Sequence, residues 1–424
     1  FLVVFIMARF RGGMAYTLGM VRAFSSSASS SFSSLAVATE GVAKGGGFRS
    51  SVSGVQAVIF GSTGFLGRYV VNAVARGGTR VILPNRADDQ EFMHMKVMGD
   101  LGQIVGFGNN STPHILRDEA LLGKALEGAD VVINLAAREY ETPNYKFGEI
   151  NVDIPKRLAR LAKAAGATKF VQTSCVGAAS DAPNAYLRSK FDGEDAVRSE
   201  FDDASIVRLA TLVGAEDRST RDVATWVLKS PFTPLWDGGD TRFRPLHVAD
   251  AAAGINIVAK SDDHAGKTLT FVGPKVFTKK EFADMVVKEV REPDNTLPLP
   301  LTLGLAMARA KEVVTNRLPF QPPAWALDPN MTSDALLALS DGCHYDPTDA
   351  ELAGADLKSV GIEPRDISKG LSLEHLRAYR YEGIDYGSTA TDAGQSVSLY
   401  KRHATQADGW QEMDVDAKVR KDIR

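Results

Sequence analysis

Residues 55–67 of this 424-residue chain read VQAVIFGSTGFLG. The apolar run 55–60 predicts a buried strand, and Gly61, Gly64 and Gly67 follow it directly, ahead of a helical pattern. Glycine permits a tight turn, a close backbone approach to a pyrophosphate, and close packing of helix on strand, while the helix N-terminus presents N–H groups to phosphate. The stretch therefore predicts a dinucleotide-binding turn. A glycine-rich loop that only reverses the chain is the plainer alternative.

Outward from this turn, short apolar runs alternate with helical segments as far as about residue 215. The further strand-like runs are 80–84, 130–135, 169–173 and 205–210, and the helical segments include 68–76, 119–126 and 186–200. His114–Arg117 also reads as strand-like. This alternation predicts an α/β fold with a doubly wound parallel sheet. Beyond residue 215 prolines become frequent, which predicts a smaller C-terminal lobe of shorter elements.

The end of the second predicted strand bears on the choice of cofactor. An NAD site places Asp or Glu about 20 residues beyond the glycines, to accept the ribose 2′-hydroxyl. Here Pro84 is followed by Asn85 and Arg86, and the first acid is Asp88. Because a guanidinium can pair with a 2′-phosphate, Arg86 favours NADPH over NADH, with Arg68 at the facing helix start. A solvated loop arginine is the alternative.

Tyr186 and Lys190 form a second pattern with chemical meaning. Their i, i+4 spacing puts both side chains on one helix face, where a lysine can hold a ribose and lower the pKa of the phenol. Thr173 and Ser174, at the end of the preceding predicted strand, could supply a hydroxyl that polarises a carbonyl. A core tyrosine beside a surface lysine is the structural alternative.

Charge is unevenly distributed. The whole chain carries a net charge of −3, yet residues 1–50 are net positive and residues 7–39 contain no acid. Spaced arginines followed by a serine run are typical of a transit peptide, so we expect residues 1–44 to direct the chain to the mitochondrion, although a plastid or a serine-rich cytosolic tail would share this composition. The acidic remainder disfavours nucleic-acid binding. The polar residues 382–424 read as an extension.

Composition excludes several classes of protein. With 44% hydrophobic and 24% charged residues the chain is an ordinary core-forming protein. It lacks the roughly 18–20 continuous apolar residues of a membrane-spanning helix. Its two cysteines, Cys175 and Cys343, rule out a disulfide scaffold or a cysteine-based zinc site, and they favour a reducing compartment.

Several of these motifs together resemble the extended and atypical short-chain dehydrogenase/reductases. Runs at 49–54, 98–103, 132–142 and 186–190, with 357–380, resemble more narrowly the NADPH-binding accessory subunit family of mitochondrial respiratory complex I. The resemblance spans about residues 45–381. It implies a Rossmann domain over 45–215 and a C-terminal lobe over 216–381. The nucleotide contacts that it implies are Gly61, Ser62, Thr63, Gly64, Phe65, Leu66, Gly67, Arg86, Asp118, Ala136, Tyr186 and Lys190.

In that family the subunit is non-catalytic and belongs to the matrix arm, peripheral to the inner membrane and in contact with other complex I subunits. The resemblance thus implies a structural NADPH, no catalytic residues and no metal. The alternative is a soluble matrix NADPH-dependent reductase or epimerase that uses Tyr186, Lys190 and Ser174. An RNA-binding relative is disfavoured by the acidic body of the chain.

Overall fold

The computed structural model describes residues 53–86, 89–108, 114–141, 145–230, 232–317, 332–337, 355–368 and 370–380. The expected transit peptide (1–44), the polar extension (382–424) and Cys343 lie outside these ranges. The helices are α3 (Phe65–Ala75), α4 (Asp89–Lys96), α5 (Glu119–Leu126), α6 (Ile154–Ala164), α7 (Ala185–Glu200), α8 (Arg218–Lys229), α9 (Val248–Lys260), α10 (Lys279–Val290), α11 (Leu301–Arg317) and α12 (Ser333–Leu337).

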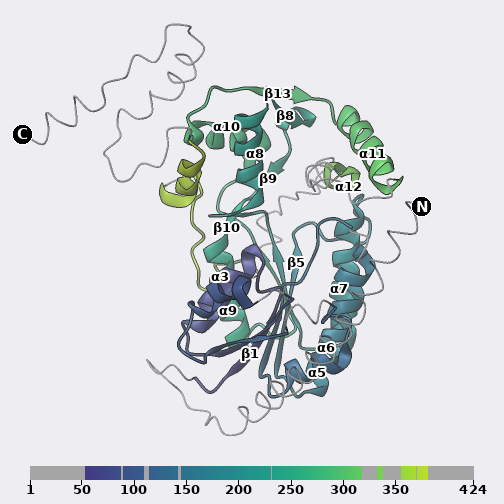
Figure 1. Ribbon diagram of the computed structural model, residues 1–424, viewed down its shortest axis with the longest axis vertical. Coiled ribbons are helices and arrows are strands. Elements are labelled where there is room, and N and C mark those ends of the chain that lie inside the picture. The colour runs from purple at the N-terminus through teal and green to yellow at the C-terminus, as the bar shows by residue number, and fades with distance from the viewer. Residues whose placement is uncertain are drawn as a thin grey trace, which may run out of the picture.

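A parallel seven-stranded sheet in the order β11-β6-β5-β4-β1-β2-β3 forms the centre of the molecule (Figure 1). Its strands are β1 (Gln56–Phe60), β2 (Arg80–Pro84), β3 (Ile104–Phe107), β4 (Val131–Asn134), β5 (Lys169–Cys175), β6 (Ser205–Leu209) and β11 (Thr268–Phe271). The order reverses between β1 and β4, which puts the carboxyl ends of these two strands at a topological switch point. The doubly wound α/β class predicted from the sequence is confirmed.

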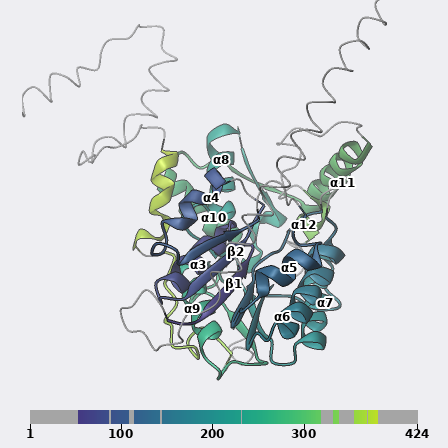
Figure 2. The same ribbon diagram turned by 60° about the horizontal axis from the view of Figure 1, so that its bottom comes forward.

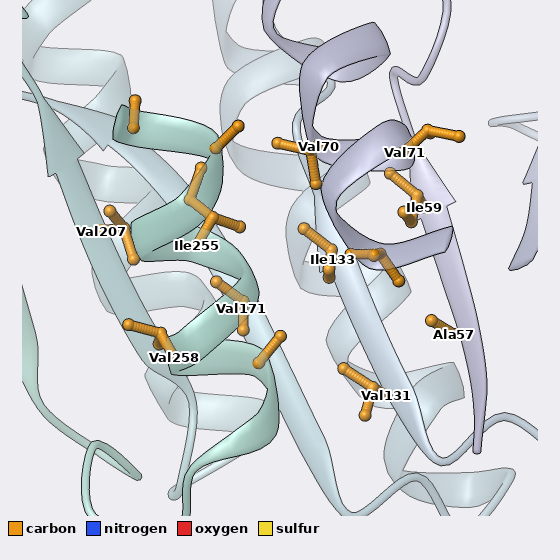
Figure 3. Close-up of a cluster of buried hydrophobic side chains, with 14 of the residues drawn as sticks. Ala57, Ile59, Val70, Val71, Val131, Ile133, Val171, Val207, Ile255 and Val258 are labelled. Carbon is orange, nitrogen blue, oxygen red and sulfur yellow. The ribbon is translucent and has the colours of Figure 1, made fainter. Parts of the chain in front are cut away.

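Helices cover both faces of the sheet (Figure 2). On one face α3 and α9 pack side by side. Figure 3 shows Val70 and Val71 of α3 near the strand residue Ile59, and Ile255 of α9 near Val171 and Val207. On the other face α5, α6 and α7 cover a second core around Phe60, Phe170 and neighbouring side chains. Because both faces are buried, residues 57–60 of β1 and 131–133 of β4 are continuous apolar runs.

A smaller lobe is formed by elements that follow β6 in the chain and do not join the large sheet, whereas α9 and β11 from the same part of the chain belong to the sheet domain. The lobe contains α8, α10 and the 3₁₀ helix η5 (Gly370–Tyr379), which share a separate apolar core. Its strands form short pairs: β7 (Leu212–Val213) with β10 (Leu246–His247), β8 (Thr233–Trp236) with β13 (Thr296–Leu299), and β9 (Arg242–Phe243) with β12 (Phe277–Thr278). These strands are two to four residues long. The division of the chain at residue 215 into a Rossmann domain and a C-terminal lobe stays a prediction.

Side-chain caps begin several of the helices. The carboxylate of Asp118 accepts the N–H groups of the first turn of α5, and Asp217 does the same for α8. At α10, Thr278 and Glu281 form a reciprocal capping box, with hydrogen bonds of 3.1 and 2.9 Å. Such caps satisfy N–H groups that a helix leaves unpaired.

The edge of the sheet differs from the sequence-based expectation. His114–Arg117, read as strand-like, is a turn in which the Arg117 N–H donates to the His114 carbonyl at 2.8 Å. Its Ile115 is buried in the core beneath α5, so the apolar residues of this run pack without pairing. The edge strand is β3, which pairs with β2 and which the sequence reading missed.

The run 98–103, one of the family-specific signatures, builds the turn into β3. The buried Gln103 carboxamide donates to the carbonyls of Ala75 (2.6 Å) and Thr79 (2.9 Å), where α3 ends and β2 approaches. Its oxygen accepts the Asp100 N–H at 2.9 Å. A side chain on Gly99 would come within 2.9 Å of that same oxygen. The presence of Gly99 and Gln103 in this run is therefore explained by the turn that they build.

Residues 355–380, apart from residue 369, form a segment that we call the C-terminal strap (the yellow-green trace in Figure 1). Leu357 and Val360 enter the core of the sheet domain between α9 and β11, whereas Leu373 and Leu376 enter the core of the lobe. Between these two anchors, the Arg365 N–H donates to the buried Asp250 carboxylate at 2.8 Å. The strap therefore links two hydrophobic cores.

We expect Leu357→Ala to lower the free energy of unfolding by about 2–5 kcal/mol, because it leaves a cavity in the sheet-domain core. The exposed neighbour Lys358 offers a matched control, since Lys358→Ala should change stability by less than about 0.5 kcal/mol. Urea unfolding of both variants measures the difference. Equal stabilities would contradict the assigned anchoring role of the strap.

Candidate nucleotide-binding site

The glycine turn between β1 and α3 is closely packed on the neighbouring chain. Gly61 has a φ of +75°, and a side chain there would lie 2.8 Å from the backbone nitrogen of Ala136, just beyond β4. A side chain on Gly67 would collide with the carbonyl oxygens of Gly61 and Ser62. Glycine at these two positions is therefore required by the packing of strand, turn and helix, as the sequence predicted.

The N-terminus of α3 differs from the capped helices. Its N-cap is Gly64, with no side-chain hydrogen bond, and its first turn contains no acid. The hydroxyl of Ser62 is buried and has no hydrogen-bond partner among the described residues. Unpaired N–H groups, a positive dipole end and a free hydroxyl suit a pyrophosphate. Thr63 is exposed, whereas Phe65 and Leu66 are half-buried.

The two arginines that the sequence offers for a 2′-phosphate, Arg86 and Arg68, lie in different surroundings. Arg86 is exposed and has no ion-pair partner in the described ranges. Arg68, in the first turn of α3, instead forms an ion pair with Glu216 beyond β7. Arg86 is therefore the arginine available to a ligand at this edge, and its role as a nucleotide contact stays a prediction.

Two further predicted contacts have local structural roles. The Asp118 carboxylate accepts the N–H groups of Ala120 (3.0 Å) and Leu121 (3.2 Å) as the cap of α5. The Ala136 N–H donates to the side chain of Asn134 at 3.1 Å, which fixes the chain beside Gly61. Contact of Asp118 with adenine, and of Ala136 with the cofactor, stay predictions.

Tyr186 and Lys190 lie together on α7, as their spacing predicted. The Lys190 Nζ lies 5.9 Å from the centroid of the Tyr186 ring and 3.5 Å from the Thr173 carbonyl oxygen. The group beside the phenol is the thiol of Cys175, with Sγ 3.1 Å from the tyrosine oxygen. The sequence reading missed this contact, although Cys175 directly follows the two candidate hydroxyl residues.

Neither candidate hydroxyl contacts the phenol. Thr173 Oγ1 donates to the Asn134 carbonyl at 3.0 Å, and so holds β5 to β4. The Ser174 hydroxyl is buried and has no partner within the described chain. The thiol of Cys175 therefore stands where the sequence analysis expected a hydroxyl.

Burial sets the protonation of this group. It raises the pKa of the Tyr186 phenol well above its ordinary value, and Cys175 adds to the rise. It also raises the pKa of the Cys175 thiol and lowers the pKa of the Lys190 ammonium. Both upward shifts keep the phenol and the thiol protonated at neutral pH, so Tyr186 is a hydrogen-bond donor in this state.

The start of α7 is covered by a segment distant in sequence. The carboxylate of Asp334, on α12, accepts the backbone N–H groups of Ala185 (2.9 Å) and Tyr186 (3.2 Å). Ser333 next to it donates to Glu312 of α11 at 2.8 Å. Burial raises the pKa of Asp334, while the two N–H groups oppose that shift. No local sequence signal predicts this contact.

The described residues contain no cluster of three or more His, Cys, Asp or Glu side chains that could hold a metal ion. None of the helices in the described ranges has the length and apolar character needed to cross a membrane.

Residues 57–272 match the NAD dependent epimerase/dehydratase family. The chain is 38% identical over 367 residues to the Arabidopsis thaliana protein "NADH dehydrogenase [ubiquinone] 1 alpha subcomplex subunit 9, mitochondrial", covering 85% of this chain and 87% of that protein. The mouse protein of the same name is 37% identical, with 79% of this chain and 83% of the relative covered. The chain belongs to this subunit 9 family. Its sheet domain belongs to the NAD dependent epimerase/dehydratase family.

A fungal relative agrees with this assignment, and a solved structure shares the fold. The 40 kDa subunit of NADH-ubiquinone oxidoreductase from Neurospora crassa is 31% identical, with 79% of this chain and 82% of the relative covered. The NADPH-dependent quinone oxidoreductase of Escherichia coli, solved with NADPH, has the same fold, with a TM-score of 0.56 at 20% identity, covering 76% of this chain and 99% of that one. The subunit 9 family thus shares its fold with nicotinamide dinucleotide enzymes.

We expect Gly67→Ala to abolish nucleotide binding, because the added methyl would push α3 away from the turn. Gly123 of α5 offers a matched control, since a side chain there would meet nothing within 4 Å. Gly123→Ala should stabilise the chain by up to about 1 kcal/mol, because alanine is the better helix former. Thermal melting with and without NADPH measures both effects. A full NADPH-dependent shift in Gly67→Ala would contradict the assigned packing.

Proposed function

We propose that this chain is a non-catalytic, NADPH-binding accessory subunit of mitochondrial NADH:ubiquinone oxidoreductase (complex I), and that it supports assembly and stability of the matrix arm near the inner membrane. The observation that carries the proposal is the 38% identity with the plant subunit over 85% of the chain. The predicted mitochondrial targeting of residues 1–44 is consistent with that location.

NADPH as the cofactor is supported by the geometry of the turn and by the charge at the end of β2. The uncapped start of α3 and the buried Ser62 hydroxyl suit the pyrophosphate. The exposed Arg86 suits a 2′-phosphate, since a guanidinium pairs with phosphate in a bidentate manner. The nucleotide would stabilise the fold by mass action, because only the folded chain binds it.

A non-catalytic role is supported by the surroundings of Tyr186. The group beside its phenol is a thiol, which is a weaker hydrogen-bond donor than the hydroxyl expected there to polarise a carbonyl. The Asp334 carboxylate also accepts two backbone hydrogen bonds at the start of α7, the helix that carries Tyr186.

A permanent partner is supported by apolar surface on the lobe. Leu303 and Met307 of α11 are 46% and 48% exposed, and the neighbouring Leu297 of β13 is 41% exposed. Their spacing puts Leu303 and Met307 on one helix face, one turn apart. Contiguous exposed apolar side chains of this kind are typical of interaction sites.

The second candidate is a soluble matrix reductase or epimerase that uses NADPH. The observation in its favour is the retained pair on α7, in which Lys190 is buried and Tyr186 is partly buried. In that reading Tyr186 is the acid and Lys190 holds the ribose.

Migration on a native gel of gently solubilised mitochondria tests the proposal directly. We expect the chain to comigrate with the respiratory NADH dehydrogenase. Migration only as a free monomer or dimer would contradict the accessory role and favour the reductase.

Arg86→Glu should lower NADPH retention and the amount of assembled complex together, because it places a carboxylate beside the 2′-phosphate. Arg76→Glu, at the exposed far end of α3, is the matched charge reversal and should leave both unchanged. Nucleotide released from the purified complex and in-gel activity are the two measurements. Normal assembly without nucleotide would count against a structural cofactor.

Tyr186→Phe should leave NADH:ubiquinone activity nearly unchanged, because the phenol takes no part in turnover under the proposed role. Activity per assembled complex in mitochondrial membranes is the measurement. Collapsed activity with normal assembly would refute the non-catalytic role.

A further inference from the structure

Asn85 is a buried polar residue at the carboxyl end of β2. Neither the glycine turn nor Arg86 explains why a polar side chain is buried there. Asn85 is only 6% exposed. Its backbone N–H donates to the Phe107 carbonyl at 2.9 Å, so it continues the pairing of β2 with β3. Its side-chain Nδ2 donates to the Leu83 carbonyl at 3.2 Å.

The other half of the Asn85 carboxamide is unsatisfied. Its Oδ1 is fully buried and accepts no hydrogen bond from the described part of the chain. Turning the amide over would not help, because Leu83 offers a carbonyl that only accepts. A buried acceptor without a donor is unfavourable, so a ligand that supplies the donor would remove that cost.

The position of Asn85 in the sheet indicates which part of a nucleotide would supply this donor. β2 lies beside β1, whose carboxyl end leads into the glycine turn. Alternation along the strand puts Asn85 on the same face as Leu83, which packs in the core beneath α3. In a doubly wound sheet the adenosine ribose lies at the carboxyl end of the second strand, about 20 residues beyond the glycines.

The chemistry of Asn85 Oδ1 further limits which group of the nucleotide can bind it. Oδ1 only accepts hydrogen bonds, and a phosphate at neutral pH offers acceptors, so Asn85 does not read the 2′-phosphate. When that phosphate occupies the 2′ position, the remaining donor on the same ribose is the 3′-hydroxyl. We propose that Asn85 Oδ1 accepts a hydrogen bond from the 3′-hydroxyl of the adenosine ribose. This inference rests on the proposed binding of NADPH.

The residue type is part of the inference. An aspartate or glutamate would accept the same hydroxyl, but its charge would repel a 2′-phosphate. Asparagine supplies the acceptor without the charge. Asn85 is therefore a specificity-determining residue that works with Arg86 to favour the 2′-phosphorylated nucleotide.

Calorimetric titration of the full chain, purified free of nucleotide, tests the contact. The probes are 2′,5′-ADP and its 3′-deoxy analogue. We expect the parent chain to bind the analogue about five-fold more weakly, the effect of one hydrogen bond, and Asn85→Ala to bind both probes equally. Equal binding by the parent chain, or a five-fold difference that persists in Asn85→Ala, would overturn the inference.

Asn256→Ala is the matched control. Asn256 also has a buried Oδ1 without a partner in the described residues, but it lies on α9, about 12 Å along the helix from its start. This variant should keep the five-fold difference. A chain that binds neither probe would instead contradict the proposed cofactor, which separates the two failures.

Asn85→Asp tests specificity independently. It should weaken binding of 2′,5′-ADP by about ten-fold or more, through repulsion of the 2′-phosphate, and weaken 5′-AMP far less. Circular dichroism of each variant confirms that it is folded. Equal losses for the two probes would contradict a role for the neutral carboxamide in selecting the 2′-phosphate.

Discussion

The contact on which the rest of the site depends is the close approach of the glycine turn to the chain beyond β4. Gly61 lies against the backbone of Ala136, and Gly67 lies against the carbonyls of Gly61 and Ser62. These contacts fix α3 at the switch point of the sheet, with its first N–H groups uncapped. The groups that we assign to the phosphates and the adenosine ribose are placed relative to that helix start: the Ser62 hydroxyl, and the carboxamide and guanidinium at the end of β2. Packing and ligand binding thus impose the same requirement on the same glycines.

The surroundings of Tyr186 bear on the non-catalytic role that we propose for this chain. The Tyr186–Lys190 pair lies on one helix, with the ammonium 5.9 Å from the centroid of the ring. Its immediate partner is a thiol, and its helix start is occupied by a carboxylate from α12. Both contacts are made by single side chains, and the parallel sheet is intact around them. Relatives with the same fold can therefore differ in function through a few side chains around one phenol.

Local sequence patterns predicted the strands and helices, whereas the details of the candidate site depend on contacts between distant segments. The strand and glycine turn at 55–67, the alternation that follows, and the pairing of Tyr186 with Lys190 were all readable, because each is a feature of one short segment. β3 was missed because it is a four-residue edge strand, and His114–Arg117 was misassigned because a short apolar run can pack without pairing. The contact of Asp334 with α7, and the unsatisfied oxygen of Asn85, depend on which segments meet in space. No spacing rule reports them.

The C-terminal strap has a consequence for the order of folding. Its residues bond to partners far back in the sequence, such as Arg365 to Asp250 and His375 to Thr220. A chain delivered from its N-terminus onward can form its sheet early, yet both hydrophobic cores keep an open side until the strap arrives. Contacts between such distant segments are entropically costly and form slowly. The late, partly open species would expose apolar surface, and it is the stage at which a chaperone would be needed.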